Sequence, residues 1–295
     1  MRVNPDLQTG LLAALDRSGA NEQTVLKQLS SGLRIQTPSD DPAGAAAVVE
    51  VQAFDADTQQ FLANVQAMRT QMQAADSALN SAEQAVQRAV TLGVQGATST
   101  LSDDDRTAIA NELFGIKDQL LELSNSSLQG VYLFGGTAVS RPPYLADNAS
   151  PSGIQYQGND QSNQVEVGQD YWIRSNLPGT AIFGDGSTGV FKSISDLITA
   201  VQNNSGVDVA TSSLKNLDAQ LSAARVQYGN SMNQLDSSES IMNDRHVELQ
   251  QQLSDISAVD MPQAISNLVS AETSRNALLQ VIAKTNGLSL FDYLK

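Results

Sequence analysis

The sequence predicts a mainly α-helical protein with an inserted β-rich domain, in which the N- and C-terminal segments pair as an elongated antiparallel coiled-coil rod. Two long stretches have apolar residues spaced alternately by three and four, which is the helical coiled-coil pattern. A middle segment is instead rich in glycine and aromatic residues. Aromatic residues are only 5% of the chain, which suits slender helical layers better than a broad globular core.

The first long helix is predicted between Gly44 and Gly93, a segment that contains neither glycine nor proline. A helix of about 50 residues would be ~75 Å long. Methionine and phenylalanine at this spacing are typical of packing between helices rather than of a cofactor site. The predicted seam consists of Val51, Phe54, Thr58, Phe61, Val65, Met68, Met72, Ala75, Leu79, Ala82, Val86 and Ala89.

A second long helix is predicted near the other end of the chain. Its seam also contains Ser231, Ser238 and Arg245, so the seam cannot exclude water along its whole length. Its apolar positions are Leu214, Leu217, Leu221, Ala224, Tyr228, Leu235, Met242, Leu249 and Ile256. A shorter helix lies between the two and starts with a capping box formed by Ser102 and Asp105. Its apolar residues are Ile109, Leu113, Ile116, Leu120 and Leu123.

Residues 130–191 hold ten of the 20 glycines, four of the eight prolines and eight of the fourteen aromatic residues. Short apolar runs, VYLF at 131, IQY at 154, QVEV at 164, YWIR at 171 and AIF at 181, alternate with turn residues and predict strands. A short helix is predicted over 191–202. We therefore expect terminal assembly helices (1–37 with 262–295), a coiled-coil rod (38–129 with 204–261) and an inserted β-rich outer domain (130–203).

Both chain ends are predicted helices with apolar residues on more than one face. A two-helix unit has too little interior to cover two apolar stripes per helix, so neighbouring copies would cover the surplus. Breaks separate these helices from the rod: Gly32 and Pro38 on one side and Pro262 on the other, with Asp40 or Asp41 capping the next helix. The predicted assembly interface is Leu7, Leu11, Leu15, Leu26, Leu29, Leu33, Ile265, Leu268, Val269, Leu278, Leu279 and Ile282, and Leu12 and Val25 belong to the same apolar pattern.

The formal net charge of −15 opposes binding to nucleic acid or to anionic membranes. The chain has no cysteine, and it has no run near the ~20 apolar residues of a membrane helix, so we expect no disulfide, no thiol chemistry and no membrane insertion. The start MRVNPDLQTGLLAALDR lacks the continuous apolar core of a secretory signal.

Three patterns suggest chemistry, and each has a simpler interpretation. GDGSTG at 184–189 matches a dinucleotide-binding glycine pattern, but no strand bearing an acidic residue follows it, and Asp208 lies next to a helix. His246 is the only histidine, so we expect a surface residue rather than a metal ligand. The acidic runs at 40–41 and 103–105 lack the Ca²⁺-loop spacing and are expected to be helix caps. We predict no catalytic, cofactor or metal site.

The motif LSSGLRI at 29–35, followed by DDPAG at 40–44, resembles the N-terminal signature of the bacterial flagellin superfamily, which usually has two alanines where this chain has Pro42 and Ala43. The start MRV, GVYLFGG at 130, ARVQYGNSMNQL at 224 and SLFDYL at 289 are similar to the hook-filament junction branch of that superfamily. The resemblance covers most of the helical part but little of residues 144–183. Flagellins proper usually end in a glutamine-rich segment, whereas this chain has Phe291 to Leu294.

This resemblance implies terminal helices that form an inner tube, rods around them and a β-rich domain facing outward. It implies an extracellular structural adaptor that joins the hook side to the filament by self-assembly into a short helical zone. Export would use the flagellar type III apparatus without a cleaved signal. Implied partners are its own copies, another hook-associated junction protein, flagellin and an export chaperone. The alternatives are a filament flagellin and, less favoured, a nucleotide-binding module or carboxylate enzyme with a pocket in the β-rich segment.

Overall fold

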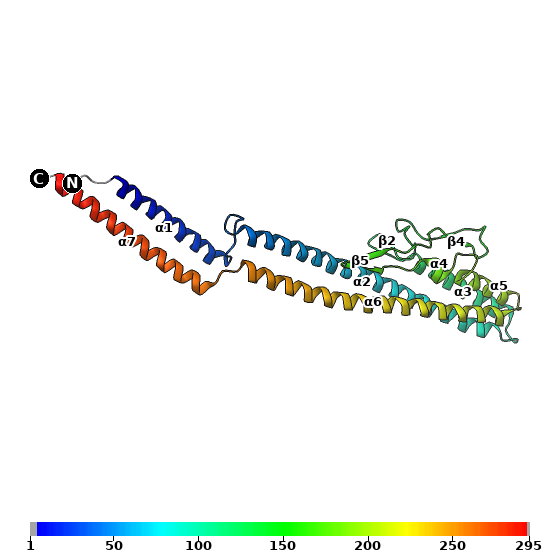
Figure 1. Cartoon of the computed structure of the whole chain (residues 1–295). Coiled ribbons are helices and arrows are strands. Elements are labelled where there is room, and N and C mark those ends of the chain that lie inside the picture. Colours follow the sequence, from blue (N-terminus) through cyan, green and yellow to red (C-terminus); the bar gives the residue numbers. More distant parts are fainter. Residues whose placement is uncertain (1–4, 294–295) are drawn as a thin grey trace. The chain divides into compact units, whose positions relative to one another are not determined.

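The computed structural model describes the backbone of residues 5–293 and the side chains of residues 9–284. Contacts divide the chain into two compact units, Met1–Asp57 with Arg245–Lys295, and Thr58–Asp244. The helices are α1 (Pro5–Ser31), α2 (Pro42–Gly96), α3 (Asp103–Ser124), α4 (Gly179–Phe183), α5 (Val190–Gln202), α6 (Val207–Ser257) and α7 (Met261–Tyr293). The strands are β1 (Ser127–Leu128), β2 (Val131–Tyr132), β3 (Tyr144–Ala146), β4 (Ile154–Tyr156), β5 (Gln164–Gly168) and β6 (Tyr171–Arg174) (Figure 1).

The predicted fold class is confirmed: the chain is mainly helical with a small β-rich insertion, and the long helices pair antiparallel. In the second unit, Arg69 of α2 contacts Glu239 of α6, whereas Gln87, further along α2, contacts Asp218, earlier on α6. In the first unit, α1 and α7 lie side by side in opposite directions. The division into three domains stays a prediction.

The predicted seam of α2 is confirmed over most of its length, because all eight of its residues from Val65 to Ala89 are buried. The prediction for Phe54 is wrong, since its side chain is 49% exposed and Asp55 is buried instead, at 7%. Asp55 Oδ1 lies 2.5 Å from Nδ1 of His246, and Gln250 donates to Oδ2 at 3.0 Å. A carboxylate with such partners tolerates burial. His246 is partly exposed, and its ring pairs with Asp55, a contact that the sequence did not indicate.

One polar seam position of α6, Ser238, has its partner in the inserted segment. Ser238 is buried and donates its hydroxyl to the carbonyl of Val167 in β5 at 2.7 Å. From α2, Asn64 donates to the neighbouring carbonyl of Glu166 at 2.8 Å. The β5–β6 hairpin therefore packs on both long helices. Its own residues Val167 and Ile173 are buried.

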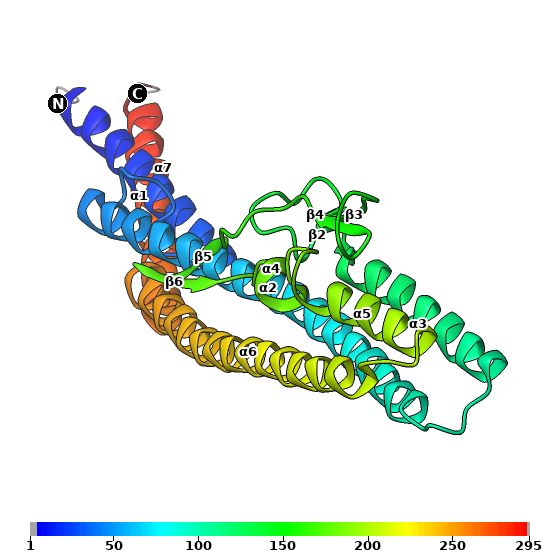
Figure 2. The same ribbon diagram turned by 90° about the vertical axis from the view of Figure 1, so that its right-hand side faces the viewer.

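The capping box of α3 is confirmed. Ser102 Oγ accepts from the amide of Asp105 at 3.2 Å, and the Asp105 carboxylate accepts from the amide of Ser102 at 3.3 Å. Hydrogen bonds from the side chain and the backbone of Ser102 lower the pKa of Asp105. Helix α3 begins at Asp103 as predicted and packs beside α5 (Figure 2).

The inserted segment forms three separate two-stranded antiparallel sheets, β1–β2, β3–β4 and β5–β6. The strands predicted near 131, 154, 164 and 171 are confirmed, but the strand predicted at 181–183 is wrong, because these residues belong to α4. A three-residue apolar run has no distinguishing period. Here Pro178 precedes the helix, and Phe183 packs edge-on against Phe134 at 5.3 Å between ring centroids. These aromatic residues share one core with α2, α3, α5 and α6.

Replacing Leu79 by alanine is expected to lower the free energy of unfolding by roughly 2–5 kcal/mol, because the fully buried side chain would leave a cavity between the helices. Urea unfolding followed by circular dichroism measures the change. The exposed Gln84→Ala on the same helix is the control and should have little effect. Equal stability of both variants with the wild type would contradict the assigned seam.

Acid is expected to weaken the pairing of α2 and α6 through Glu83. Ser222 and then Arg225 donate to its carboxylate, at 2.5 and 2.7 Å, and lower its pKa below the ordinary value of 4.5. This stabilisation is therefore present above pH 4.5 and is lost as pH falls through the lowered pKa. Glu83→Gln should be less stable at pH 7 and less sensitive to acid below pH 4.5 in urea titrations. The exposed Glu50→Gln is the control, and an identical loss in both variants would contradict the assignment.

Candidate assembly interface

The two breaks between the terminal helices and the long helices lie side by side, as the sequence predicts. After α1 ends at Ser31, Gly32 adopts a positive φ of 72°. The amide of Arg34 donates to the carbonyl of Ser257 at 2.6 Å, and the amide of Val259 donates to the carbonyl of Gly32 at 3.0 Å. These bonds enclose an isolated antiparallel bridge between Leu33 and Ala258 and fix where both chain segments turn.

The side chain of Arg34 joins the two turns, which no sequence pattern indicated. Its guanidinium contacts Asp41 at 3.1 Å and donates to the carbonyl of Ile256 at 2.9 Å. The other oxygen of Asp41 accepts from the amide of Gly44 at 3.0 Å and so caps α2. The Gly44 amide and then Arg34 lower the pKa of Asp41.

The acidic runs accept hydrogen bonds from backbone amides: Asp41 and Asp105 cap helices as predicted, whereas Asp40 stabilises the preceding turn. One carboxylate oxygen of Asp40 accepts from the amides of Gln36 and Thr37, at 3.0 and 2.8 Å, and these bonds lower the pKa of Asp40. Residues 103–105 form the first turn of α3. Over the described residues, no group of three or more histidine, aspartate or glutamate side chains is placed to hold a metal.

Polar contacts hold α1 and α7 in register, but the helices cover few of their apolar side chains. Ser18 donates to the carbonyl of Ala271 at 3.2 Å, and Arg275 pairs with Glu22 at 2.9 Å. Ala264 is the one buried residue of α1 and α7 among the side chains described. Six predicted interface residues lie half-buried along the pair: Leu11, Leu15, Leu29, Leu268, Leu278 and Ile282.

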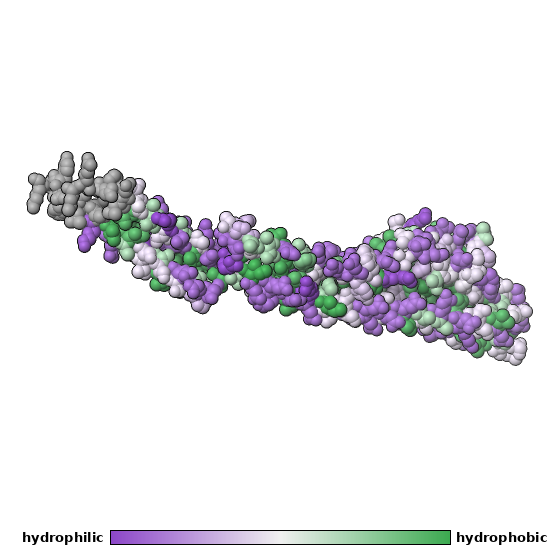
Figure 3. Space-filling model, viewed as in Figure 1, coloured by the Kyte–Doolittle hydropathy of each residue, from purple (hydrophilic) through white to green (hydrophobic). Residues whose placement is uncertain are grey.

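The other predicted interface residues are exposed, as the excess of apolar residues suggested. These are Leu26, Leu33, Ile265, Val269 and Leu279, and the side chain of Leu7 lies outside the described residues. Leu12, Met261 and Val281 are exposed as well. Met261 and Val281 were not among the predicted interface residues. Figure 3 shows hydrophobic residues on the surface along α1 and α7, between hydrophilic ones.

A groove of about 630 Å³ runs along one side of the α1–α7 pair. Small and polar residues dominate its lining, and Arg17 is the charged residue among them. Its lining residues are Ala14, Arg17, Ser18, Asn21, Thr24, Val25, Asn267, Ser270, Ala271, Ser274 and Leu278. The pair thus has a hollow side lined mainly by small side chains in addition to its exposed apolar residues.

Charge is distributed unevenly along the chain. Residues 1–37 and 262–295 contain seven basic and five acidic residues, a net charge of +2, whereas residues 38–261 contain ten basic and 27 acidic residues, a net charge of −17. The sum is the −15 of the whole chain. Copies can therefore bring their terminal helices together without the repulsion that the rest of the surface would cause.

The glycine pattern at 184–189 forms a turn between helices rather than a nucleotide site. It follows α4 and precedes α5, and no parallel strand pairs occur among the strands of the described chain. The carboxylate of Asp185 accepts from the amides of Ser187 and Thr188, at 2.9 and 2.8 Å. A Cβ on Gly186, whose φ is +95°, would lie 2.0 Å from the carbonyl oxygen of Ile154. The glycines therefore serve close packing of the chain.

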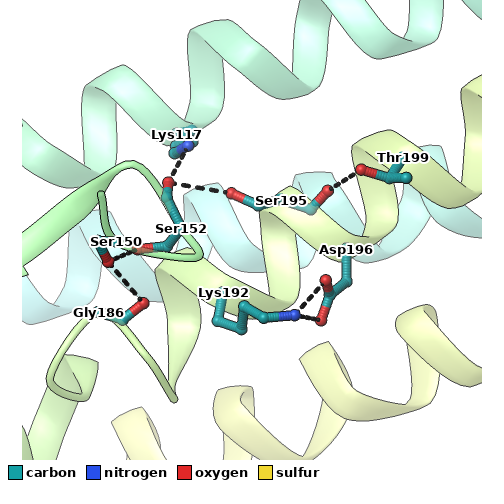
Figure 4. Close-up of polar contacts among 8 residues, drawn as sticks. All are labelled: Lys117, Ser150, Ser152, Gly186, Lys192, Ser195, Asp196 and Thr199. Atoms are coloured by element: carbon teal, nitrogen blue, oxygen red, sulfur yellow. Dashed lines mark hydrogen bonds and ion pairs between the residues drawn. The ribbon is translucent and has the colours of Figure 1, made fainter. Parts of the chain in front are cut away.

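A lysine lies near several serines, but their bonds are structural (Figure 4). Burial lowers the pKa of Lys117, and a lowered pKa is typical of lysines that act as bases. However, its ammonium donates to the backbone carbonyl of Ser152, not to the hydroxyl. That hydroxyl donates to the carbonyl of Ile154 at 3.0 Å, and Ser195 donates to the Ser152 carbonyl at 3.3 Å. The cluster ties the loop before β4 to α3 and α5.

No helix among the described residues has both the length and the apolar character needed to cross a membrane.

Comparison with known proteins identifies the relatives of the chain. The bacterial flagellin N-terminal helical region matches residues 7–138. Flagellar hook-associated protein 3 of Escherichia coli is 29% identical, in an alignment that covers 91% of this chain and 92% of that protein. The protein of the same name from Salmonella typhimurium is also 29% identical, over 95% of both chains.

Solved structures share the fold. A flagellar hook-associated protein from Vibrio parahaemolyticus superposes with a TM-score of 0.69 at 20% identity, covering 74% of this chain and 100% of that one. FlgL from Xanthomonas campestris superposes with a TM-score of 0.62 at 20% identity. The superposition covers 68% of this chain and 98% of the FlgL chain. These solved chains are thus shorter than this one. Together, the motif, the fold and these matches show that residues 7–138 form a bacterial flagellin N-terminal helical region and that the chain is similar to flagellar hook-associated protein 3 over nine tenths of its length.

Proposed function

We propose that this protein is a structural subunit of the bacterial flagellum that joins the hook side to the filament by self-assembly into a short helical zone. The observation that carries the proposal is the exposed apolar surface of α1 and α7, in a chain that aligns with hook-associated protein 3 over 91% of its length. Its role is structural rather than enzymatic. Assembly outside the cell requires export, for which the flagellar type III apparatus and an export chaperone are the proposed route.

Apolar burial favours association of the terminal helices. Ile265 and Val269 are 52% and 55% exposed, and Leu26 and Leu279 nearly as much. Covering a half-exposed aliphatic side chain contributes roughly 1 kcal/mol. Several such residues in every copy, repeated along an array, add up to a favourable contribution to association. The small net charge of the terminal segments keeps repulsion low.

Filament flagellin is the second candidate function. The alignment with a flagellin supports it less strongly than the alignments with hook-associated protein 3 support the first. Flagellin of Clostridium tyrobutyricum is 26% identical, but the alignment covers 72% of this chain and only 52% of that protein. Hook-associated protein 3 is instead covered almost completely. A junction layer has unlike neighbours on its two sides, and the proposed neighbours are another hook-associated junction protein and flagellin.

Replacing Leu268 by glutamate is expected to reduce incorporation into flagella at least about tenfold, because a carboxylate would be buried in the interface without a partner. The helicity of the purified chain should change little, since Leu268 is only half-buried in it. Immunoblots of purified flagella measure incorporation. Ser266→Glu adds the same charge at an exposed position of α7 and serves as the control. Normal incorporation of the Leu268 variant would refute the assigned interface.

The length of the assembled zone separates the two candidates. In cells that lack their own hook-associated protein 3, labelled copies of this chain should form a short band between hook and filament and restore filament growth. Electron microscopy with antibody labelling locates the band, and the same cells without the chain are the control. Label along the whole filament would instead identify a flagellin.

A further inference from the structure

The α1–α7 pair has two unlike sides. The groove lies on one of them, with Ser18 and Asn21 from α1 and Asn267 and Ser274 from α7. Val25 and Leu278 lie one heptad after the contacting residues Ser18 and Ala271, so they face the partner helix. Successive helical residues are about 100° apart and Thr24 and Ser270 line the groove, so Leu26 and Leu279, on the opposite flank of this contact line, point to the other side. The two sides differ in shape.

The second side is an apolar ridge. We use this name for the exposed residues Leu12 and Leu26 of α1 and Ile265, Val269 and Leu279 of α7. Leu12 and Leu26 are two heptads apart, and Ile265 and Leu279 are also two heptads apart, so each pair keeps to one stripe of its helix. In an antiparallel pair, both stripes lie on the same side.

Apart from the Glu22–Arg275 ion pair that links the two helices, the two sides carry opposite charges at one level of the pair. Arg17 lines the groove. Its guanidinium donates a hydrogen bond to the carbonyl of Ala13 on the same helix, at 3.1 Å. Glu272 is exposed and lies one heptad after Ile265 and one before Leu279, which places it on the ridge. Ser18 contacts Ala271, so the neighbouring residues Arg17 and Glu272 are at the same level of the pair but on opposite sides.

We propose that the ridge of one copy packs into the groove of the next copy, with Glu272 of one facing Arg17 of the other. This inference rests on the proposed function and specifies its contact. A contact between two unlike surfaces is heterologous, and such contacts generate rings or helical arrays rather than closed dimers. The opposite charges fix which side meets which and disfavour ridge-to-ridge association.

Charge exchange tests the contact. Arg17→Glu or Glu272→Arg alone should lower incorporation into flagella about fivefold, because like charges then meet in every contact. The double variant should restore it, since the two charges within one copy are on opposite sides and can only pair between copies. Lys27→Glu and Asp16→Arg make the same charge changes elsewhere on α1 and should have no effect. Equal loss in the single and the double variants would overturn the proposal.

Cross-linking tests the geometry, because the chain contains no cysteine of its own. With Arg17→Cys and Glu272→Cys in one chain, oxidation should give a ladder of dimers, trimers and higher species. Either cysteine alone should give no dimer. Dimers from a single-cysteine variant would show contact between like sides and would overturn the proposal, as would assembled flagella in which the double variant forms no ladder.

The same ladder is measured on the concentrated purified chain, which separates this proposal from the proposed function. If the wild type is absent from the hook-filament boundary but the purified double variant forms a ladder, the junction role fails and the groove contact stands. If the wild type joins flagella normally and neither preparation forms a ladder, the junction role stands and the groove contact fails.

Discussion

Two helices cannot cover apolar surface on more than one side of each, and this constraint governs the terminal part of the molecule. In the second unit, α2 and α6 bury their seam because α3, α5 and the β5–β6 hairpin pack around them. The α1–α7 pair has no such layer among the described residues, and only Ala264 is buried in it. Little apolar burial therefore stabilises this pair within the chain, and under the proposed function neighbouring copies cover the remaining apolar surface.

The turns between helices are built much more completely than the terminal helices themselves. Arg34 contacts Asp41 and the carbonyl of Ile256, and Asp41 also caps α2. Backbone hydrogen bonds also join the turn between α1 and α2 to the turn between α6 and α7. A firm attachment at one end and exposed apolar sides along the rest suit a segment that must leave the helix bundle at a fixed place and then pack against other copies.

Periodicity made much of this structure predictable. The seam of α2, the capping box of α3 and the adjacent breaks follow from spacing, because a helix repeats its faces regularly. The strand predicted at 181–183 failed, since a three-residue apolar run fits either structure. The prediction that Phe54 is buried was wrong because Asp55 takes the buried position. The two partners of Asp55 are His246 and Gln250, which lie about 190 residues away in sequence. The role of Arg34 and the groove also depend on contacts between distant segments, so sequence spacing could not predict them.

Hydrogen exchange on the free and the assembled protein tests most directly whether the terminal helices depend on neighbouring copies. In the purified chain, amides of α1 and α7 should exchange orders of magnitude faster than those of α2 between Val65 and Leu92, where the side chains are buried. In isolated flagella, the terminal amides should become protected to the level of α2. Protection of α1 and α7 in the free chain equal to that in flagella would contradict this account.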